Sequence, residues 1–287
     1  MIQPKLAERL LAEARRINRP EFIGEDPVQF PRRFSIQPDI EVTALLIACI
    51  SWGKRTMIRR DAERLLDLTD CQPYRFMMER AYEDVDPALN IHRTFFGRDL
   101  QWYLRALRGI YKKHGTLENF CRHIGAGDAE TPSWVLAEAM LNEALAANDG
   151  ATCAQCIPTN LRTTALKRLN MALRWLVRDD GIVDIGVWKC IPKSKLFIPL
   201  DVHAGNTARE LGLLTRKAND RRSVELLTES MREICPEDPA LLDFALFGLG
   251  VEKASAPKTT AEESDNAKSP YHKKCQAGVA DLEQVLA

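Results

Sequence analysis

The stretch Phe197-Ile198-Pro199-Leu200-Asp201-Val202-His203 decides how this chain is interpreted. A short apolar run and a proline precede an aspartate, and the helical pattern of residues 204–214 follows it. Aspartate is a preferred N-cap because its carboxylate accepts hydrogen bonds from unpaired N–H groups of the first turn, where the helix dipole also favours negative charge. We therefore predict that Asp201 begins a helix. Its carboxylate is either a cap alone or a cap that also does chemistry.

Outward from this stretch, apolar residues recur at helical spacing along nearly the whole chain. Prolines stand near the starts of these segments and glycines near the breaks, as helix ends require. Only residues 195–198 have the composition of a short strand. The sequence predicts an all-α fold, with its later helices over residues 100–114, 117–123, 133–147, 161–177, 204–213, 223–234 and 240–249.

The C-terminal part of the chain differs in composition. Residues 252–266 are polar and lack large apolar side chains, so burial cannot offset the entropy of ordering them. We expect one helical domain over residues 1–250 and a flexible tail over 251–287. Val279, Leu282, Val285 and Leu286 could form a short terminal helix in that tail.

The overall composition is that of an ordinary globular protein. Of 287 residues, 45% are hydrophobic and 28% charged, and the formal net charge is zero. A nucleic-acid ligand would therefore need a local basic surface. Residues 161–200 hold eight basic and three acidic side chains, and a second basic cluster, Lys54 to Arg60, follows Trp52. Such runs are equally often solvated helix faces.

Several classes of protein are disfavoured. No apolar run approaches the roughly 18 residues of a membrane span, and the N-terminus lacks a signal-peptide pattern, so we expect a cytoplasmic protein without a membrane partner. Eight cysteines are then expected as thiols. The pair Cys153-x-x-Cys156 has metal-ligand spacing, but no second pair completes a zinc site. We predict no metal and no cofactor.

Several blocks of this chain carry a family resemblance. Residues 199–203, with Thr207-Ala208-Arg209 and Leu211-Gly212-Leu213 after them, are similar to the helix-hairpin-helix DNA glycosylase superfamily, whose P-x-D-x-H segment starts a helix and supplies the catalytic Asp. Residues 39–52 resemble the superfamily's early helix, which ends at a loop facing the DNA, and residues 242–250 resemble a later one. The resemblance covers most of residues 38–250.

A narrower resemblance names a family without an activity. Residues 92–95, 167–178 and 185–189 are similar to an uncharacterised bacterial family, domain of unknown function 2400. Two features of the superfamily are missing. The glycine-rich hairpin is reduced to one glycine, Gly186, within residues 183–195, and only Cys275 follows Gly250, which leaves no ligands for the superfamily's iron–sulfur cluster.

The resemblance implies a two-lobed fold with a cleft near residues 197–205, in which a flipped nucleotide loses its base by hydrolysis of the N-glycosidic bond. Asp201 would be the catalytic carboxylate of this base-excision repair reaction. No lysine stands near Ile182, where the lyase members carry theirs, so a monofunctional hydrolase without a Schiff base is preferred. Lys167 is the weaker catalytic candidate.

The remaining candidate residues would contact DNA, and the protein is expected as a monomer on duplex DNA. Trp52 stands where the superfamily fills the gap left by a flipped base. The other predicted contacts are His203, Lys54, Arg168, Arg174, Lys189, Lys193 and Lys195. Two alternatives stay open: a non-catalytic DNA-binding module, in which Asp201 is a cap only, and an enzyme acting on a free nucleoside or nucleotide.

Overall fold

The computed structural model describes residues 2–255, and the side chains of residues 2–251. The remainder of the predicted tail, with its possible terminal helix, lies outside the described residues. The described part is mostly helical, as predicted. Its α-helices are α1 Pro4–Ile17, α2 Pro20–Ile23, α3 Gln37–Ile50, α4 Arg55–Leu68, α5 Pro73–Met78, α6 Gly97–His114, α7 Leu117–His123, α8 Pro132–Ala147, α9 Lys167–Val177, α10 Val202–Glu210, α11 Arg221–Ile234 and α12 Leu242–Ser255.

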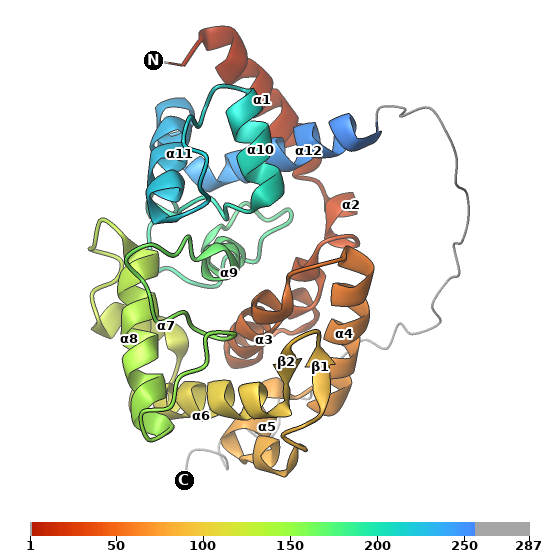
Figure 1. The fold of residues 1–287 in the computed structure, drawn as a ribbon, viewed down its shortest axis with the longest axis vertical. Helices are drawn as coiled ribbons and strands as arrows, with labels where there is room; N and C mark the ends of the chain where they lie inside the picture. The colour runs from red at the N-terminus through yellow and green to blue at the C-terminus, as the bar shows by residue number, and fades with distance from the viewer. Residues whose placement is uncertain (1, 256–287) are drawn as a thin grey trace.

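The helices form two groups with α9 between them (Figure 1). One group combines the first helix with the last three, because α1 and α10 both pack on α12. The other group contains α3 to α8 and a small antiparallel hairpin of β1 Asn90–His92 and β2 Phe95–Phe96. The helix α9 packs against α3 and α8 of this second group.

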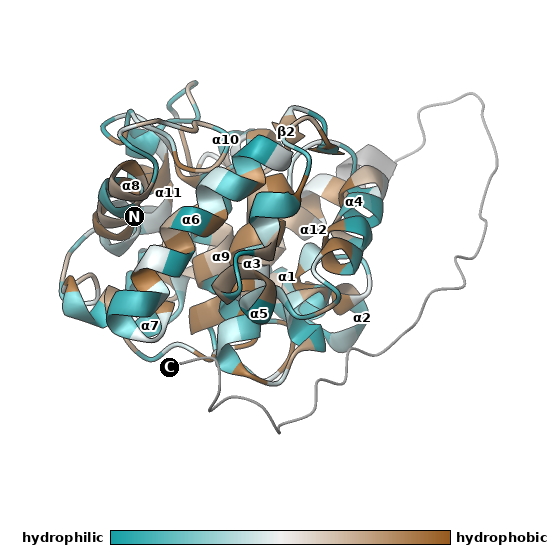
Figure 2. Ribbon diagram, turned by 90° about the horizontal axis from the view of Figure 1, so that it is seen from below, coloured by the Kyte–Doolittle hydropathy of each residue, from teal (hydrophilic) through white to brown (hydrophobic). Residues whose placement is uncertain are grey.

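The helix α3 forms the centre of the second group. Residues 39–50 are all buried, so this helix is enclosed on every side, as its nearly uninterrupted apolar sequence requires. The surrounding helices are amphipathic instead. Hydrophilic and hydrophobic residues alternate along α6 in Figure 2, and its Leu100, Leu104 and Leu107 are fully buried. The helices therefore cover a single contiguous core.

Two glycines of α12 allow neighbouring helices to approach it closely. A Cβ atom at Gly248 would lie 2.1 Å from Oε1 of Glu13 in α1, and one at Gly250 would lie 3.0 Å from Oγ1 of Thr207 in α10. Both contacts are tighter than ordinary van der Waals packing. Small residues at these two positions therefore allow α1 and α10 to pack closely on α12.

Two local predictions were wrong. The helix expected over residues 161–177 begins only at Lys167, because Leu166 adopts a left-handed backbone conformation with φ 50° that interrupts it. Residues 195–198 form no strand; a 3-10 turn, Lys193–Lys195, leads into extended chain. The Ile198 amide there donates to Oγ1 of Thr228 at 3.1 Å instead of to a partner strand.

Candidate functional site

A cavity of about 1150 Å³ lies where the two helix groups meet α9. This volume is slightly above the roughly 300–1,000 Å³ of typical small-molecule sites. Its walls come from the turn before α4, the N-terminus of α9, the start of α10 and the first turns of α12. The polar and charged lining residues include Asp26, Ser51, Arg55, Lys167, Arg168, Arg174, Asp201, His203, Asn219 and Asp243.

Asp201 is the N-cap of α10, as predicted. Its Oδ1 accepts a hydrogen bond from the Ala204 amide at 2.9 Å, and its backbone carbonyl accepts one from Nδ2 of Asn219 at 3.1 Å. No described residue donates a hydrogen bond to the second carboxylate oxygen. The cap thus uses one oxygen of Asp201 and leaves the other available in the cavity.

Lys167 enters the same cavity from the first position of α9. Its Nζ lies 3.4 Å from the Ser51 carbonyl oxygen and 3.5 Å from Sδ of Met171, and it forms no ion pair within residues 2–251. Burial lowers the pKa of this amine, while the negative charges of Asp201 and Asp243 partly oppose the shift. The two predicted catalytic residues therefore share one cavity and one electrostatic environment.

A third ionisable residue in the cavity, Asp243, was missed by the sequence reasoning. It lies in the first turn of α12, and its Oδ2 accepts a hydrogen bond from Nη1 of Arg174 at 2.5 Å. Burial raises the pKa of Asp243 to about 6; Arg174 and Lys167 act against this rise, and Asp201 adds to it. Asp243 belongs to a block quoted for the family resemblance, but nothing in its spacing marked it as ionisable near neutral pH.

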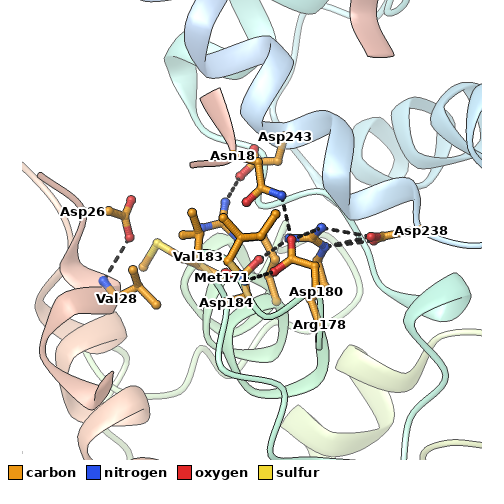
Figure 3. Close-up of polar contacts among 12 residues, drawn as sticks. Asn18, Asp26, Val28, Met171, Arg178, Asp180, Val183, Asp184, Asp238 and Asp243 are labelled. Carbon is orange, nitrogen blue, oxygen red and sulfur yellow. Dashed lines mark hydrogen bonds and ion pairs between the residues drawn. The ribbon is translucent and has the colours of Figure 1, made fainter. Parts of the chain in front are cut away.

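Behind Asp243, a buried network of ion pairs crosses the interior. Arg174 is 4% exposed and also contacts Oδ1 of Asp184 at 3.2 Å. Arg178 binds Asp184 and, at 2.9 Å, Asp238 (Figure 3). Asp180, a further partner of Arg178, accepts from Nδ2 of Asn18. Arg174 was predicted to contact a DNA phosphate. Its buried guanidinium is instead bound to two carboxylates, which compete with a phosphate for its donors.

Trp52 lies on the cavity wall and is held by the β1–β2 hairpin. Its ring is covered by the Arg93 guanidinium, 4.5 Å from the ring centre, and meets the His92 ring edge-on at 5.5 Å. The Trp52 carbonyl oxygen lies 2.8 Å from Nε2 of His92. These contacts fix the orientation of the Trp52 ring.

The other predicted contacts separate into two sets. His203 lines the cavity and is exposed, Lys54 is exposed beside Trp52, and Arg168 lines the cavity while donating to the carbonyl oxygens of Cys49 and Gln155. Three lysines lie outside the cavity lining and have their own partners. Lys189 binds Asp179 at 2.7 Å, Lys193 lies 4.0 Å from the same carboxylate, and Lys195 donates to the Asp128 carbonyl oxygen at 2.9 Å.

Apolar groups also gather at this cavity. Among residues 2–251, Val202 (63% exposed) and Val251 (45%) are the large hydrophobic side chains that remain exposed, and both line it. On the wall beside Val251, Phe22 meets Phe244 and Phe247 edge-on, with ring centres 5.3 Å apart in both pairs. Exposed apolar side chains gathered at a cavity mark a ligand or partner surface.

Of the Cys153-x-x-Cys156 pair, Cys156 lines the cavity and Cys153 does not. The two Sγ atoms are 3.4 Å apart, and Sγ of Cys153 lies 3.3 Å from Oδ1 of Asp99. Burial raises the pKa of Cys156 well above its usual range. Nowhere in residues 2–251 do three or more His, Cys, Asp or Glu side chains come together as a metal site. No described helix is long and apolar enough to cross a membrane.

Comparison with known families matched residues 26–252 to the family described as "protein of unknown function (DUF2400)". The chain belongs to this family. The matched residues contain every charged residue of the cavity, whereas α1, which packs on α12, precedes them. Comparison with curated proteins and with solved structures gave no match.

Proposed function

We propose that this DUF2400 protein cleaves the N-glycosidic bond of a nucleotide flipped out of duplex DNA into the cavity. One observation carries the proposal: Asp201, with one carboxylate oxygen that no described residue binds, and the half-buried Lys167 line a single cavity from the N-termini of two different helices. The helix-hairpin-helix glycosylase resemblance of residues 199–213 supports it. An enzyme needs such a cavity because a glycosidic bond inside stacked DNA is inaccessible.

Asp201 supplies the electrostatic part of the reaction. As the C1′–N bond breaks, positive charge develops on the deoxyribose, and an adjacent carboxylate stabilises that charge. The Ala204 amide holds one oxygen of Asp201 in place, so the carboxylate is oriented before the substrate arrives. Capping and catalysis are therefore compatible in this residue.

The apolar part of the cavity suits a flipped base, and the neighbouring wall suits the duplex that the base has left. Phe22 and Phe247, which are partly buried and line the cavity, offer aromatic surfaces to a flipped base, and the exposed Val202 stands one residue from the catalytic carboxylate. Trp52, fixed by His92 and Arg93, is positioned to stack where the base has left the helix. Lys54 and Arg55 add positive charge beside it for the phosphates.

Lys167 favours a glycosylase-lyase over the monofunctional hydrolase that the sequence indicated. A lysine attacks C1′ only as the neutral amine, and burial shifts Lys167 toward that form. Attack forms the C1′–Nζ bond as the base departs, the amine loses a proton, and opening of the sugar ring gives the imine. The left-handed Leu166 ends the preceding loop and places Lys167 at the helix start, so a lysine near Ile182 is not required.

The test is a panel of duplexes, each with one modified base, incubated with the protein and then treated with borohydride or alkali. We expect base release from at least one duplex and a borohydride-trapped protein–DNA crosslink. Lys167→Gln should abolish the crosslink, while Lys189→Gln, a surface lysine paired with Asp179 outside the cavity lining, should retain it.

Each other outcome contradicts a definite part of the proposal. Base release without a crosslink restores the monofunctional hydrolase. DNA binding without base release from any duplex supports the non-catalytic DNA-binding module. Base release only from free nucleosides supports the enzyme that acts on a free nucleoside or nucleotide.

A further inference from the structure

Asp243 lines the cavity and is bound to the protein interior through one of its carboxylate oxygens. Its side chain is 15% exposed, and the residue lines the cavity. Oδ2 is bound by Arg174, while Oδ1 has no hydrogen-bond partner in the described part of the chain. An oxygen left in this way within a cavity is free to bear a proton or to bind one from a ligand.

Burial disfavours the negative charge of Asp243, and the charged groups around this residue act in both directions. The helix α9 contributes Lys167 and Arg174, α10 contributes Asp201 with His203 nearby, and Asp26 approaches from the segment before α3. Behind them, two guanidinium groups (Arg174, Arg178) are shared among four carboxylates: Asp180, Asp184, Asp238 and Asp243. Among these four, Asp243 is the one that lines the cavity, so it can exchange a proton with a ligand there.

We propose that Asp243 is the proton donor to the departing base, and that Asp201 and Asp243 divide the acid and electrostatic roles between them. This inference rests on the proposed function. Pairs of carboxylates in one site whose environments separate their protonation behaviour are the usual basis of such a division. Asp201 caps α10 through the Ala204 amide, whereas burial favours the neutral form of Asp243.

The reaction balances with these two residues and water or Lys167. The C1′–N bond breaks, and its electron pair goes to the base nitrogen. The Asp243 carboxyl transfers its proton to the base, which leaves as a neutral molecule, and Asp243 becomes a carboxylate. The C1′ cation takes the oxygen of water, or Nζ of Lys167, and the proton released by that nucleophile returns to Asp243 through solvent.

If Asp243 only anchored Arg174, the rate of base release would depend on the leaving base in a different way. An anchor would matter equally for every leaving group, whereas a proton donor matters only for a base that must gain a proton to leave. A base such as 7-methylguanine already carries a positive charge in the nucleotide and departs neutral without any donor. Hypoxanthine has the same purine frame but lacks that charge.

The experiment compares release of hypoxanthine and 7-methylguanine from otherwise identical duplexes by the wild type, Asp243→Asn and Asp184→Asn. General acid catalysis contributes about 10²–10⁴-fold. Asp243→Asn should therefore lose at least about 100-fold for hypoxanthine and less than about 3-fold for 7-methylguanine. Asp184→Asn disturbs the same arginine away from the cavity and should affect the two bases equally.

Measurements on the wild type guard against a variant that fails to fold. The hypoxanthine rate should fall about tenfold per pH unit above the titration of Asp243, while the 7-methylguanine rate should not. Equal pH profiles for the two bases, or equal losses in Asp243→Asn, would overturn the assignment of Asp243 while leaving the proposed function standing. Release of neither base, nor of any other modified base, by the wild type would overturn the proposed function and this inference with it.

Discussion

The imidazole of His92 joins Trp52 to a buried carboxylate: its Nε2 lies 2.8 Å from the Trp52 carbonyl oxygen, and its Nδ1 lies 2.7 Å from Oδ2 of Asp61. His92 is fully buried and Asp61 is 1% exposed. Burial disfavours the Asp61 charge, yet hydrogen bonds from His92 and Arg60 hold the pKa of this carboxyl below its usual range. A residue on the cavity wall is thus positioned by a polar pair inside the second helix group.

Replacing His92 tests this support. His92→Ala leaves the Asp61 carboxylate buried without its main partner, which should lower the free energy of unfolding by about 3 kcal/mol in urea titrations. His123→Ala, at an exposed histidine, should stay within about 0.5 kcal/mol of the wild type. If both variants unfold at the same urea concentration, the Asp61–His92 pair does not stabilise the folded protein.

Asp201→Asn separates the cap from the chemistry. Asparagine caps a helix about as well as aspartate, so the free energy of unfolding should change by less than about 1 kcal/mol. Loss of the charge facing the sugar cation should reduce base release by about 100-fold or more. Asp220→Asn is the matched control, because Asp220 caps α11 through the Ser223 amide at 3.0 Å and lies outside the cavity lining. Undiminished release by Asp201→Asn would exclude Asp201 from catalysis.

Local sequence patterns predicted the helices well. Apolar spacing and proline positions located α6, α7, α8 and α11 to within a few residues, because those signals act within one turn. The start of α9 could not be predicted in this way. Leucine rarely adopts a left-handed conformation, so the break at Leu166 depends on packing around the cavity rather than on its own preference.

The site was only partly predictable for a related reason. Asp201, Lys167 and Trp52 were proposed separately, and the fold brings them to one cavity. The basic run of residues 161–200 was misleading, because sequence alone does not show which arginines have carboxylate partners. Arg174 and Arg178 are neutralised by aspartates that include Asp238 and Asp243, some 60 residues later. For the same reason, the sequence did not show that Asp243 belongs to the site, because its partner Arg174 lies far from it in the chain.

DNA binding should depend on the basic residues beside Trp52. Lys54 is exposed, and its side chain has no ion pair with a described residue. Lys54→Glu should weaken binding to all duplex sequences and reduce the slope of log K against log salt by about 1, since one phosphate contact is lost. Lys189→Glu, away from the cavity, should leave the slope unchanged. Equal effects of the two reversals in fluorescence titrations would remove Lys54 from the interface.

The buried carboxyl of Asp243 should make stability depend on pH in a defined direction. Its folded pKa of about 6 lies above the unfolded value, so the native state keeps a proton that the unfolded chain releases. The contribution of Asp243 to the free energy of unfolding therefore falls as pH rises from about 4 to 6, and it stays constant above pH 6. Asparagine does not titrate, so Asp243→Asn should gain about 3 kcal/mol relative to the wild type between pH 4 and 7.

The same measurement in an Asp201→Asn background tests whether the two carboxylates interact. The Asp201 charge raises the pKa of Asp243, so removing it should lower that pKa and narrow the pH-dependent difference in stability between the Asp243→Asn variant and its parent chain. Chemical unfolding at several pH values gives this difference in both backgrounds. Parallel curves for the wild type and Asp243→Asn would show that folding does not raise the pKa of Asp243. A difference untouched by Asp201→Asn would show that the Asp201 charge does not influence that pKa.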